Sequence, residues 1–457
     1  MLDLKQVLKV IIDAKLELGE KFMPAKYFFL LRRALAIVLG VLLLVGFAGW
    51  FYPLPLFDLQ LVPLLQSLSL SFTTLACLLV GVVVVLTLLF GRIYCSTLCP
   101  LGLLQELLLF LYHPLFHRFK KKSSGNFYQK HYAWHYVLAA LLLGAMLGGT
   151  ALLVRMFDPY SIFGNAASKA RFGLAVVMIL AVVVFFRKRF FCVNICPVGA
   201  VLGWLSRFAL FKIHFAADGC VKCGMCARHC PSGSIDYVNQ SINNETCVRC
   251  LRCLVPCRKG SIIGASVQPK PEIPFSPARR RLLISAAVLG AFAGAFKAGA
   301  SISQMVAQKV KRVIVPAGAK NYRDFANRCL NCNLCVGNCP MKIIKKADSE
   351  YPAVHIDYGE NFCKYDCCKC SQVCPSGAIR KIPLSEKQNT QIAVAVVDED
   401  RCIGCGLCVR ECPRSVISKD EEKAMVDASE CIGCGVCASV CPVKAINIYP
   451  VEEQRFM

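Results

Sequence analysis

The chain has 457 residues, of which 30 are cysteine, and it is 56% hydrophobic, only 18% charged, with a formal net charge of +24. So much apolar sequence with so few charges excludes an ordinary soluble enzyme, and the length excludes a small secreted disulfide scaffold. Most of the basic excess lies in residues 1–300 beside apolar stretches. The preference of cytoplasmic loops for Lys and Arg accounts for it there, so nucleic acid is not an expected partner.

Four stretches in the first half are apolar enough to cross a bilayer, which takes about 20 residues. They are Tyr27–Phe51, Ser67–Phe90, Trp134–Val154 and Phe172–Phe186. The distribution of basic residues favours an even number of crossings with both ends cytoplasmic and connector 50–66 outside. Three basic residues weakly oppose an outward position for the connector after the third stretch: Arg155, Lys169 and Arg171. We therefore expect a membrane α-helical bundle of four spans over residues 1–212.

A fifth apolar stretch, Leu282–Ala300, follows Arg279–Arg281 in the segment 271–300. An arginine pair before a mild apolar run resembles a twin-arginine signal, which exports folded domains that already hold their cofactors. This interpretation predicts a fifth span and places residues 301–457 outside the membrane. The alternative is an alanine-rich helix within a cytoplasmic domain.

Six runs of cysteines have the spacing of bacterial ferredoxins. Three close cysteines can wrap three corners of an Fe4S4 cube, and the fourth, usually before proline, binds the partner cube. Zinc also binds CxxC pairs, but its sites usually close with two pairs and not with triplets and a displaced fourth cysteine. We expect six [4Fe–4S] clusters in α+β ferredoxin-like two-cluster domains over 213–270, 301–390 and 391–457.

Exchange of the fourth cysteine within each pair gives the ligand sets. In chain order they are Cys220, Cys223, Cys226 and Cys257; Cys247, Cys250, Cys253 and Cys230; Cys329, Cys332, Cys335 and Cys374; Cys363, Cys367, Cys370 and Cys339; Cys402, Cys405, Cys408 and Cys441; and Cys431, Cys434, Cys437 and Cys412.

Two runs depart from the pattern. Cys257 is followed by an arginine instead of a proline. Cys363 and Cys367 are four residues apart, and Cys368 is an extra thiol. We assign Cys367 as the ligand, because it keeps the usual spacing to Cys370.

Four further cysteines lie in two related motifs at the inner ends of the second and fourth stretches. Cys95 and Cys99 lie in CSTLCPLG, and Cys192 and Cys196 lie in CVNICPVGA. The near-repeat predicts a duplicated two-helix unit that brings four thiols to one membrane face. They would form a further metal centre or a dithiol relay, or else they are inert cysteines in Pro-Gly turns. Cys77, alone within a span, is expected in the core.

Two carboxyl groups are candidates for proton transfer near the membrane surface. Glu106 follows the first CxxxCP motif, and Asp158 lies in the stretch FDPYSIFG. Either group could accept a proton from a quinol, or serve only as a cap or loop residue. No Gly-rich dinucleotide fingerprint follows a predicted strand, so no nicotinamide cofactor is expected.

Four spans with paired CxxxCP motifs and a ferredoxin pair resemble the membrane ferredoxin of periplasmic nitrate reductase systems. They also resemble the membrane domains of accessory proteins of nitrous oxide reductase and cytochrome oxidase. The twin-arginine segment with four more cluster motifs resembles the exported ferredoxin that partners the nitrate-system protein, so the chain looks like a fusion of the two. The resemblance implies anaerobic respiration, in which quinol electrons pass toward a periplasmic acceptor.

We therefore predict a multi-pass protein of the bacterial inner membrane, embedded in lipid. It would transfer electrons, as a quinol dehydrogenase-like component without catalytic residues of its own, between the quinone pool or a cytoplasmic donor and a redox partner protein outside. The first ferredoxin domain would be cytoplasmic and the C-terminal region periplasmic. Two alternatives are an accessory protein that reduces or helps to assemble another metalloenzyme, and a cytoplasmic-facing subunit of a larger anaerobic complex.

Overall fold

The computed structural model describes residues 25–49, 60–70, 74–112, 134–148, 150–151, 153–215, 220–257, 261–266, 278–309, 313–347, 353–359, 361–420 and 422–457. The chain forms two compact units. Unit 1 comprises residues 1–41, 81–135 and 180–281, and unit 2 comprises residues 42–80, 136–179 and 282–457. Neither unit is a continuous stretch, so the units cut across the predicted linear domains, whose boundaries stay predictions.

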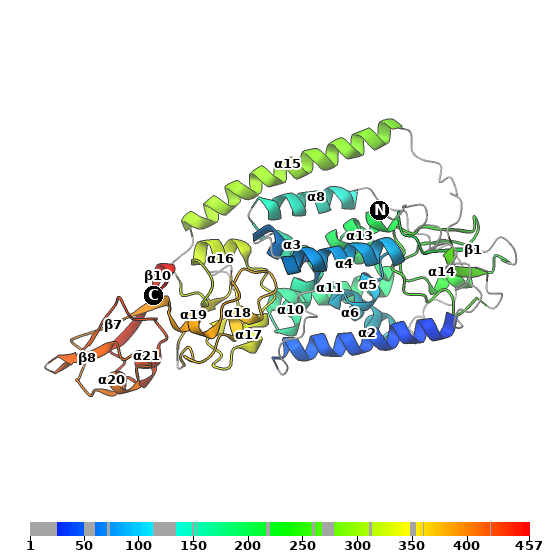
Figure 1. The fold of residues 1–457 in the computed structure, drawn as a ribbon. Coiled ribbons are helices and arrows are strands. Elements are labelled where there is room, and N and C mark those ends of the chain that lie inside the picture. The colour runs from blue at the N-terminus through cyan, green and yellow to red at the C-terminus, as the bar shows by residue number, and fades with distance from the viewer. Residues whose placement is uncertain are drawn as a thin grey trace, which may run out of the picture. The chain divides into compact units, whose positions relative to one another are not determined.

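Five helices contribute residues to both units: α2 (Ala25–Phe47), α4 (Thr74–Phe90), α8 (Trp134–Leu147), α11 (Arg171–Arg187) and α15 (Ala278–Lys309) (Figure 1). Each overlaps one of the predicted spans. The remaining elements of unit 1 are the helices α5 (Tyr94–Thr97), α6 (Pro100–Leu111), α12 (Phe190–Asn194), α13 (Pro197–Ser206) and α14 (Met225–His229), and the strands β1 (Lys212–Phe215), β2 (Ile235–Asp236), β3 (Ser241–Ile242) and β4 (Ile262–Ser266).

In unit 1 the first and last strands of the first ferredoxin-like region pair with each other. Strand β1 pairs antiparallel with β4, and β2 pairs antiparallel with β3. The backbone amides of Leu210 and Phe211 donate to the carbonyls of Leu88 and Leu89 at the end of α4. These bonds fix the region against the end of α4.

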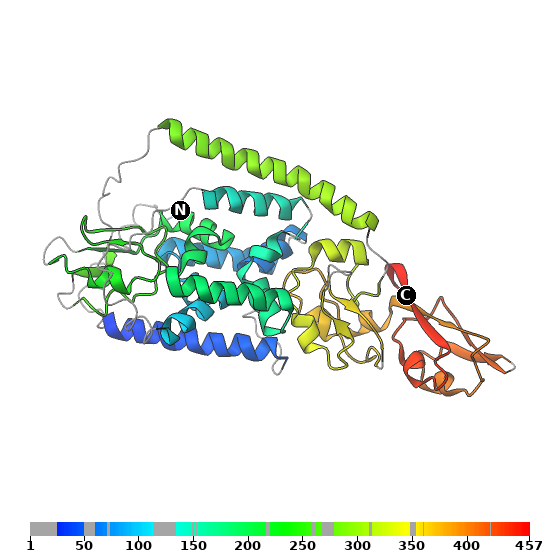
Figure 2. The ribbon, with the colours of Figure 1, turned by 180° about the vertical axis from the view of Figure 1, so that it is seen from behind.

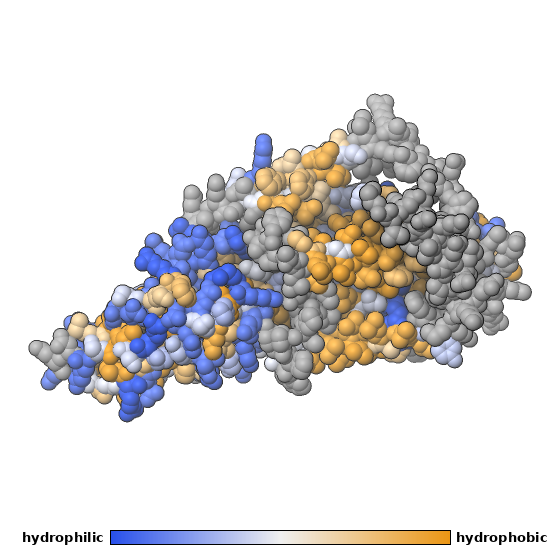
Figure 3. Space-filling view, viewed as in Figure 1, coloured by the Kyte–Doolittle hydropathy of each residue, from blue (hydrophilic) through white to orange (hydrophobic). Residues whose placement is uncertain are grey.

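The larger apolar helices expose hydrophobic side chains along their length. On α2, Leu30, Leu35, Val41 and Leu44 are exposed, and Figure 3 shows orange, apolar side chains gathered over the helices. Cys77 on α4 is also exposed, which corrects its expected place in the core. The side chain faces outward because α4 is apolar all round and its neighbours cover only part of it.

Among the described residues, one helix alone is long and apolar enough to span a membrane, Phe29–Phe47. A second span would require α10 (Pro159–Ala167) and α11 together, and these are bent by 113° at their junction. Shorter apolar helices occupy Cys77–Phe90, Pro100–Leu111, His135–Leu147, Pro197–Ser206 and Ser285–Gly299. The bundle of four or five spans therefore stays a prediction.

Unit 2 holds the cysteines after residue 301. Besides most of α8 and α15, its helices are α3 (Leu61–Leu70), α9 (Val154–Phe157), α10 (Pro159–Ala167), α16 (Tyr322–Arg328), α17 (Leu334–Asn338), α18 (Lys369–Gln372), α19 (Leu384–Gln388), α20 (Leu407–Glu411) and α21 (Val436–Val440). Its strands are β5 (Ile344–Lys345), β6 (His355–Ile356), β7 (Thr390–Val397), β8 (Ile417–Asp420), β9 (Lys423–Val426) and β10 (Ile446–Phe456). Long β7 pairs antiparallel with β10, and β8 with β9, as in a two-cluster ferredoxin whose two ends meet in one sheet.

Helices α8 and α15 run side by side in both views (Figures 1 and 2). Glycines allow this approach: a Cβ on Gly144 would lie 2.5 Å from the carbonyl oxygen of Phe292, and one on Gly299 would lie 2.8 Å from that of Ala145. Close packing of small residues is how helices associate in lipid, where no hydrophobic force drives them together. The side chains of Arg279–Arg281, the predicted export signal, lie outside the described residues.

We predict that Gly299→Leu separates α8 from α15, because the added side chain collides with the backbone at Ala145. The free energy of unfolding should fall by about 1–3 kcal/mol, the usual cost of overpacking. Gly294→Leu on the same helix is the control, since nothing lies within 4 Å of its Cβ position. Thermal denaturation in detergent compares the two, and equal midpoints would contradict this packing.

Candidate metal centres

Five of the six cysteine loops share a local backbone conformation. In each, two residues adopt a left-handed φ, one before and one after the second cysteine: 222 and 224, 249 and 251, 331 and 333, 404 and 406, and 433 and 435. At two of these positions only glycine fits, because a Cβ on Gly404 would collide with the carbonyl oxygen of Glu422 and one on Gly433 with that of Ala393. The sixth loop, 363–370, has no such residues, because its first two cysteines are four apart.

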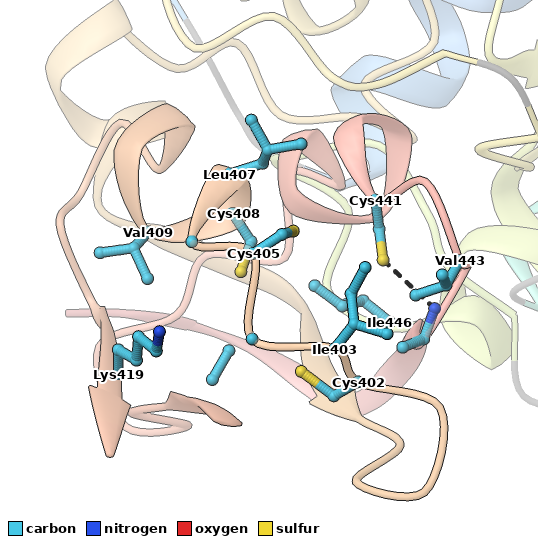
Figure 4. A pocket seen from close by; sticks show the side chains of 14 residues that line it. Cys402, Ile403, Cys405, Leu407, Cys408, Val409, Lys419, Cys441, Val443 and Ile446 are labelled. Carbon is cyan, nitrogen blue, oxygen red and sulfur yellow. Dashed lines mark hydrogen bonds between the residues drawn. The ribbon is translucent and has the colours of Figure 1, made fainter. Parts of the chain in front are cut away.

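The last pair of loops encloses two cavities. One is lined by Cys402, Cys405, Cys408 and Cys441 (Figure 4). The other is lined by Cys412, Cys431, Cys434 and Cys437. Each cavity therefore brings together three cysteines of one run and the displaced fourth of the other, which is the grouping predicted from spacing.

The looser middle pair shows the same exchange. One cavity is lined by Cys339, Cys363, Cys367 and Cys370. Cys368 does not line it, and its sulfur instead accepts a hydrogen bond from Gln372 Nε2 at 3.1 Å. The structure thus brings together the four cysteines of the predicted set and leaves the extra thiol aside.

The remaining three sets are recognised by how their thiols act on one another. Burial raises the pKa of Cys226 to about 11, and the neighbouring Cys257, Cys220 and Cys223 add to the increase. Burial likewise raises the pKa of Cys253, with contributions from Cys250, Cys247 and Cys230 and then from Cys226 of the neighbouring set. For Cys335, burial is again the main cause of a raised pKa, and the same effect comes from Cys329, Cys332 and Cys374 and then from Cys370 of the neighbouring set. Each grouping contains the four cysteines of a predicted set.

Buried thiols grouped in fours in this way can hold a metal cluster. With pKa values raised by burial, they stay neutral near pH 7 unless a metal displaces their protons. Backbone amides also point at the displaced sulfurs: Ser234 N to Cys230, Ile379 N to Cys374 and Ala445 N to Cys441, at 3.3 to 3.4 Å. Such hydrogen bonds tune an iron–sulfur cluster. No group among the described residues is arranged around a single ion, and a four-iron cube holds its ligands farther apart than one ion does.

The two CxxxCP motifs meet inside unit 1. Cys95, Cys99, Cys192 and Cys196 are all buried. Burial raises the pKa of Cys196 well above its ordinary value, and the other three thiols raise it further. The backbone amide of Gly199 donates to Cys196 Sγ at 3.3 Å, as amides do to the displaced cysteines of the ferredoxin loops. We call these four residues the paired CxxxCP site.

Glu106 lies beside this site, at the centre of three arginines. Arg32 donates to its Oε1 at 2.8 Å, Arg189 to its Oε2 at 3.1 Å, and Arg252 lies 3.5 Å from its Oε1. Burial on its own would raise the pKa of Glu106, but these guanidinium groups outweigh burial and hold the pKa below its usual range. The carboxylate is thus a buried anion that ties α2, α6, α12 and the Cys250–Cys253 loop together.

Asp158 is the N-cap of α10 in unit 2. Its Oδ2 accepts hydrogen bonds from Ser161 N at 2.8 Å and Ser161 Oγ at 2.7 Å. Burial raises its pKa to about 6, although these bonds work in the opposite direction. The cap role that was left open is therefore present, and proton transfer by Asp158 stays a prediction.

Two arginines that sequence reasoning did not propose as site residues are buried at the paired CxxxCP site. Arg92 is 2% exposed and Arg189 1% exposed. Each lies three residues before the first cysteine of its motif, so the repeated unit is RxxCxxxCPxG. Extending the alignment of the two motifs toward the N-terminus would have shown that both copies carry an arginine at this position.

Comparison with known families identifies the chemistry. Residues 72–122 and 170–216, which hold both CxxxCP motifs, match a family described as a 4Fe-4S binding domain. The chain carries 4Fe-4S binding domains. Another family with this description matches residues 326–342, and two 4Fe-4S dicluster domain families match residues 362–416 and 395–448.

The chain is also similar to several named proteins. It is 28% identical over 209 residues to the uncharacterized protein MJ0749 of Methanocaldococcus jannaschii, over 45% of this chain and 78% of that protein. It is 31% identical over 189 residues to the methylamine utilization ferredoxin-type protein MauN of Methylobacillus flagellatus, over 40% and 63%. It is 34% identical over 110 residues to the ferredoxin-type protein NapG of Escherichia coli, over 22% and 47%. No solved structure matches.

MauN and NapG are ferredoxin-type proteins by name, and together with the 4Fe-4S family matches they support 4Fe-4S electron transfer by this chain. The predicted resemblance is confirmed at that level. The fusion of two partner proteins, the number of clusters and the quinone link stay predictions.

We predict different outcomes for the two adjacent thiols of the sixth loop. Cys367→Ser should remove one cluster, about four irons per chain, because Cys367 lines the cavity. Cys368→Ser should keep full iron, because its sulfur lies outside that cavity. Iron and acid-labile sulfide analysis of both variants decides, and the reverse result would show that the loop uses the other cysteine.

We predict that Glu106→Gln destabilises unit 1 by roughly 3–5 kcal/mol, because it leaves buried arginines without their counter-ion. Glu430→Gln is the control, since Glu430 is half exposed and its pair with Arg414 should contribute less than about 1 kcal/mol. Thermal denaturation in detergent measures both. A Glu106 variant as stable as the control would contradict the role of this ion-pair network.

Proposed function

We propose that this protein is a membrane-bound [4Fe-4S] polyferredoxin that carries electrons between the quinone pool, or a cytoplasmic donor, and a redox partner outside the membrane. A bound [4Fe-4S] cluster supplies a carrier for single electrons. The chain's own residues hold these carriers, and the first ferredoxin region and the C-terminal region would serve different aqueous compartments.

The contacts of the first ferredoxin region support a cytoplasmic position. In unit 1 it contacts the ends of α4 and α11, which the basic residues assign to the inside. Lys188, just after α11, donates to the carbonyl of Arg228 at 2.7 Å, and the amide of Arg189 donates to that of Pro231 at 3.1 Å. Both acceptors lie beside Cys230, so the predicted inner end of α11 is attached to this ligand loop.

The contacts of the C-terminal region support export. In unit 2, Asn333 Nδ2 donates to Asn165 Oδ1 at 3.0 Å and to Ser168 Oγ at 2.9 Å. A Cβ on Gly164 would lie 2.3 Å from the carbonyl oxygen of Cys332. This cysteine loop therefore packs against α10 and the turn that follows it, in the connector expected outside.

The connector after the first predicted span supports the same side. Gln66 donates to the carbonyl of Arg328, one residue before Cys329. Asn338 Nδ2 donates to the carbonyl of Gly46 at 3.4 Å, near the end of α2. Both predicted outer connectors therefore contact the Cys329–Cys339 run, which is the observation that carries the proposal.

The ligand sets of unit 2 are linked in sequence. Cys329 and Cys363 belong to exchanged sets of one pair, and the amide of Cys363 donates to the carbonyl of Cys434 at 2.8 Å. Tyr358, whose hydroxyl donates to the carbonyl of Gly433, lies between these two loops. One-electron carriers in these sets would therefore form a series from the outer connectors to the C-terminal pair.

In unit 1 the paired CxxxCP site lies beside the Cys247 set. Arg189 is close to Cys95, Cys192 and Cys250 at once. A seventh [4Fe-4S] cluster at this site would place a carrier next to the apolar helices, where a quinone can approach from lipid. The 4Fe-4S family match over both motifs supports iron as the occupant.

Topology is tested with alkaline phosphatase fused after Met457 and, as the matched control, after Ser266. We expect an active enzyme only in the first fusion, because phosphatase folds outside the cytoplasm. Activity in neither fusion would favour the cytoplasmic subunit and contradict export.

The quinone link is tested with the purified protein under anaerobic conditions. A reduced quinone analogue should bleach the visible absorption of the clusters, and Cys95→Ser should slow this bleaching at least tenfold. Absence of any reduction by quinol would contradict the quinone link and favour the accessory protein.

A further inference from the structure

The two copies of RxxCxxxCPxG exchange their arginines. Arg189 Nη1 donates to the carbonyl of Cys95 at 3.2 Å and its Nη2 to the carbonyl of Gly102 at 3.1 Å. Arg92 Nη2 donates to the carbonyl of Cys192 at 2.8 Å. Each arginine therefore binds the first cysteine of the other copy.

The glycine of each motif makes room for this exchange. A Cβ on Gly102 would lie 2.2 Å from the Cys95 oxygen, and one on Gly199 would lie 2.4 Å from the Cys192 oxygen and 2.7 Å from Arg92 Nη2. In each copy of the motif, the carbonyl of the first cysteine, the glycine and the arginine of the other copy therefore lie in contact. Because the arrangement repeats in both copies, it belongs to the motif and not to one loop.

Each arginine also extends to the neighbouring ferredoxin loop. Arg92 Nη1 donates to the carbonyl of Glu245 at 2.8 Å, two residues before Cys247. Arg189 Nη2 donates to Glu106 Oε2 at 3.1 Å, and Glu106 pairs with Arg252, between Cys250 and Cys253. The two guanidinium groups therefore stand between the paired CxxxCP site and the Cys247 set.

Buried donors at this site remain available to an anion. Arg92 Nε, Arg189 Nε and Gln105 Nε2 are buried without a hydrogen-bond acceptor among the described residues. Gln105 uses its oxygen to accept from Cys192 Sγ at 3.2 Å. Unpaired buried donors are costly, and these three belong to residues that contact the CxxxCP motifs, so they favour an anionic occupant, as a thiolate-bound cluster would be.

We propose that Arg92 and Arg189 are a reciprocal pair of positioning residues that holds the four thiolates of the paired CxxxCP site and raises the reduction potential of the centre bound there. This inference rests on the proposed cluster at that site. Each guanidinium group fixes the backbone of the opposite cysteine. Its positive charge favours the form of a nearby centre that carries one more electron.

The pair also couples two centres. Since the same charges face the paired CxxxCP site and the Cys247 set, loss of one arginine should lower the potentials of both. The sets of unit 2 have no contact with either arginine among the described hydrogen bonds and should keep their potentials, which provides an internal control for folding and for cluster assembly.

The test is a redox titration of the full-length, anaerobically purified protein followed by EPR, with iron and acid-labile sulfide analysis of each sample. Arg92→Gln and Arg189→Gln should each lower the potential of the paired CxxxCP centre enough for a tenfold change in its oxidised-to-reduced ratio, about 59 mV for one electron. Arg92→Lys and Arg189→Lys keep the charge and should keep most of the potential, with weaker retention of iron. Arg207→Gln is the control. It removes an equal charge from a side chain that is 40% exposed and pairs with the Glu245 carboxylate, and it should change neither the reduction potential of the paired CxxxCP centre nor the retention of iron.

Cys95→Ser distinguishes failure of the proposed cluster from failure of the proposed arginine pair. If it removes no iron, the site holds no cluster, and both the proposed function of the site and the arginine pair are overturned. If it removes about four irons while the glutamine variants keep iron and potential, the cluster stands and the arginine pair is overturned. A glutamine variant that loses iron only at this centre supports positioning, whereas equal potentials in the lysine and glutamine variants would contradict the role of charge.

Discussion

The structure depends on how a buried thiol can carry charge. Burial raises the pKa of at least one cysteine in each of the six predicted sets, from Cys226 in the first to Cys437 in the last. A neutral thiol binds no iron, so each set acquires its charge only when a metal displaces the protons. Around the ferredoxin loops, backbone amides and left-handed residues complete the environment. At the paired CxxxCP site the buried arginines Arg92 and Arg189 bind the backbone of the motifs.

Much of the candidate site could be predicted from spacing alone. The exchange of the fourth cysteine follows from the ferredoxin pattern, and the cavities of the last pair are lined by the predicted groups. Spacing also favoured Cys367 over Cys368 as the ligand, because the two-residue gap to Cys370 sets the local path of the backbone. Cys367 lines the cavity and Cys368 does not. Such patterns are readable because they are encoded within a few residues.

What could not be predicted depends on contacts between distant segments. Arg92 and Arg189 contribute to the distribution of basic residues that predicts topology, yet they are buried and bound to carbonyls about a hundred residues away. Glu106 was a candidate proton carrier, and three arginines from other segments make it a fixed anion. Cys77 was assigned to the core because it lies in an apolar run, but an all-apolar helix does not reveal which face its neighbours cover.

The central claim is that cysteines throughout the chain, those of the paired CxxxCP site included, hold iron–sulfur clusters. Iron and acid-labile sulfide per chain in anaerobically purified, full-length protein test it most directly. Seven clusters predict about 28 of each. About 24 of each would remove the centre at the paired CxxxCP site, and a colourless protein without iron would contradict the entire account.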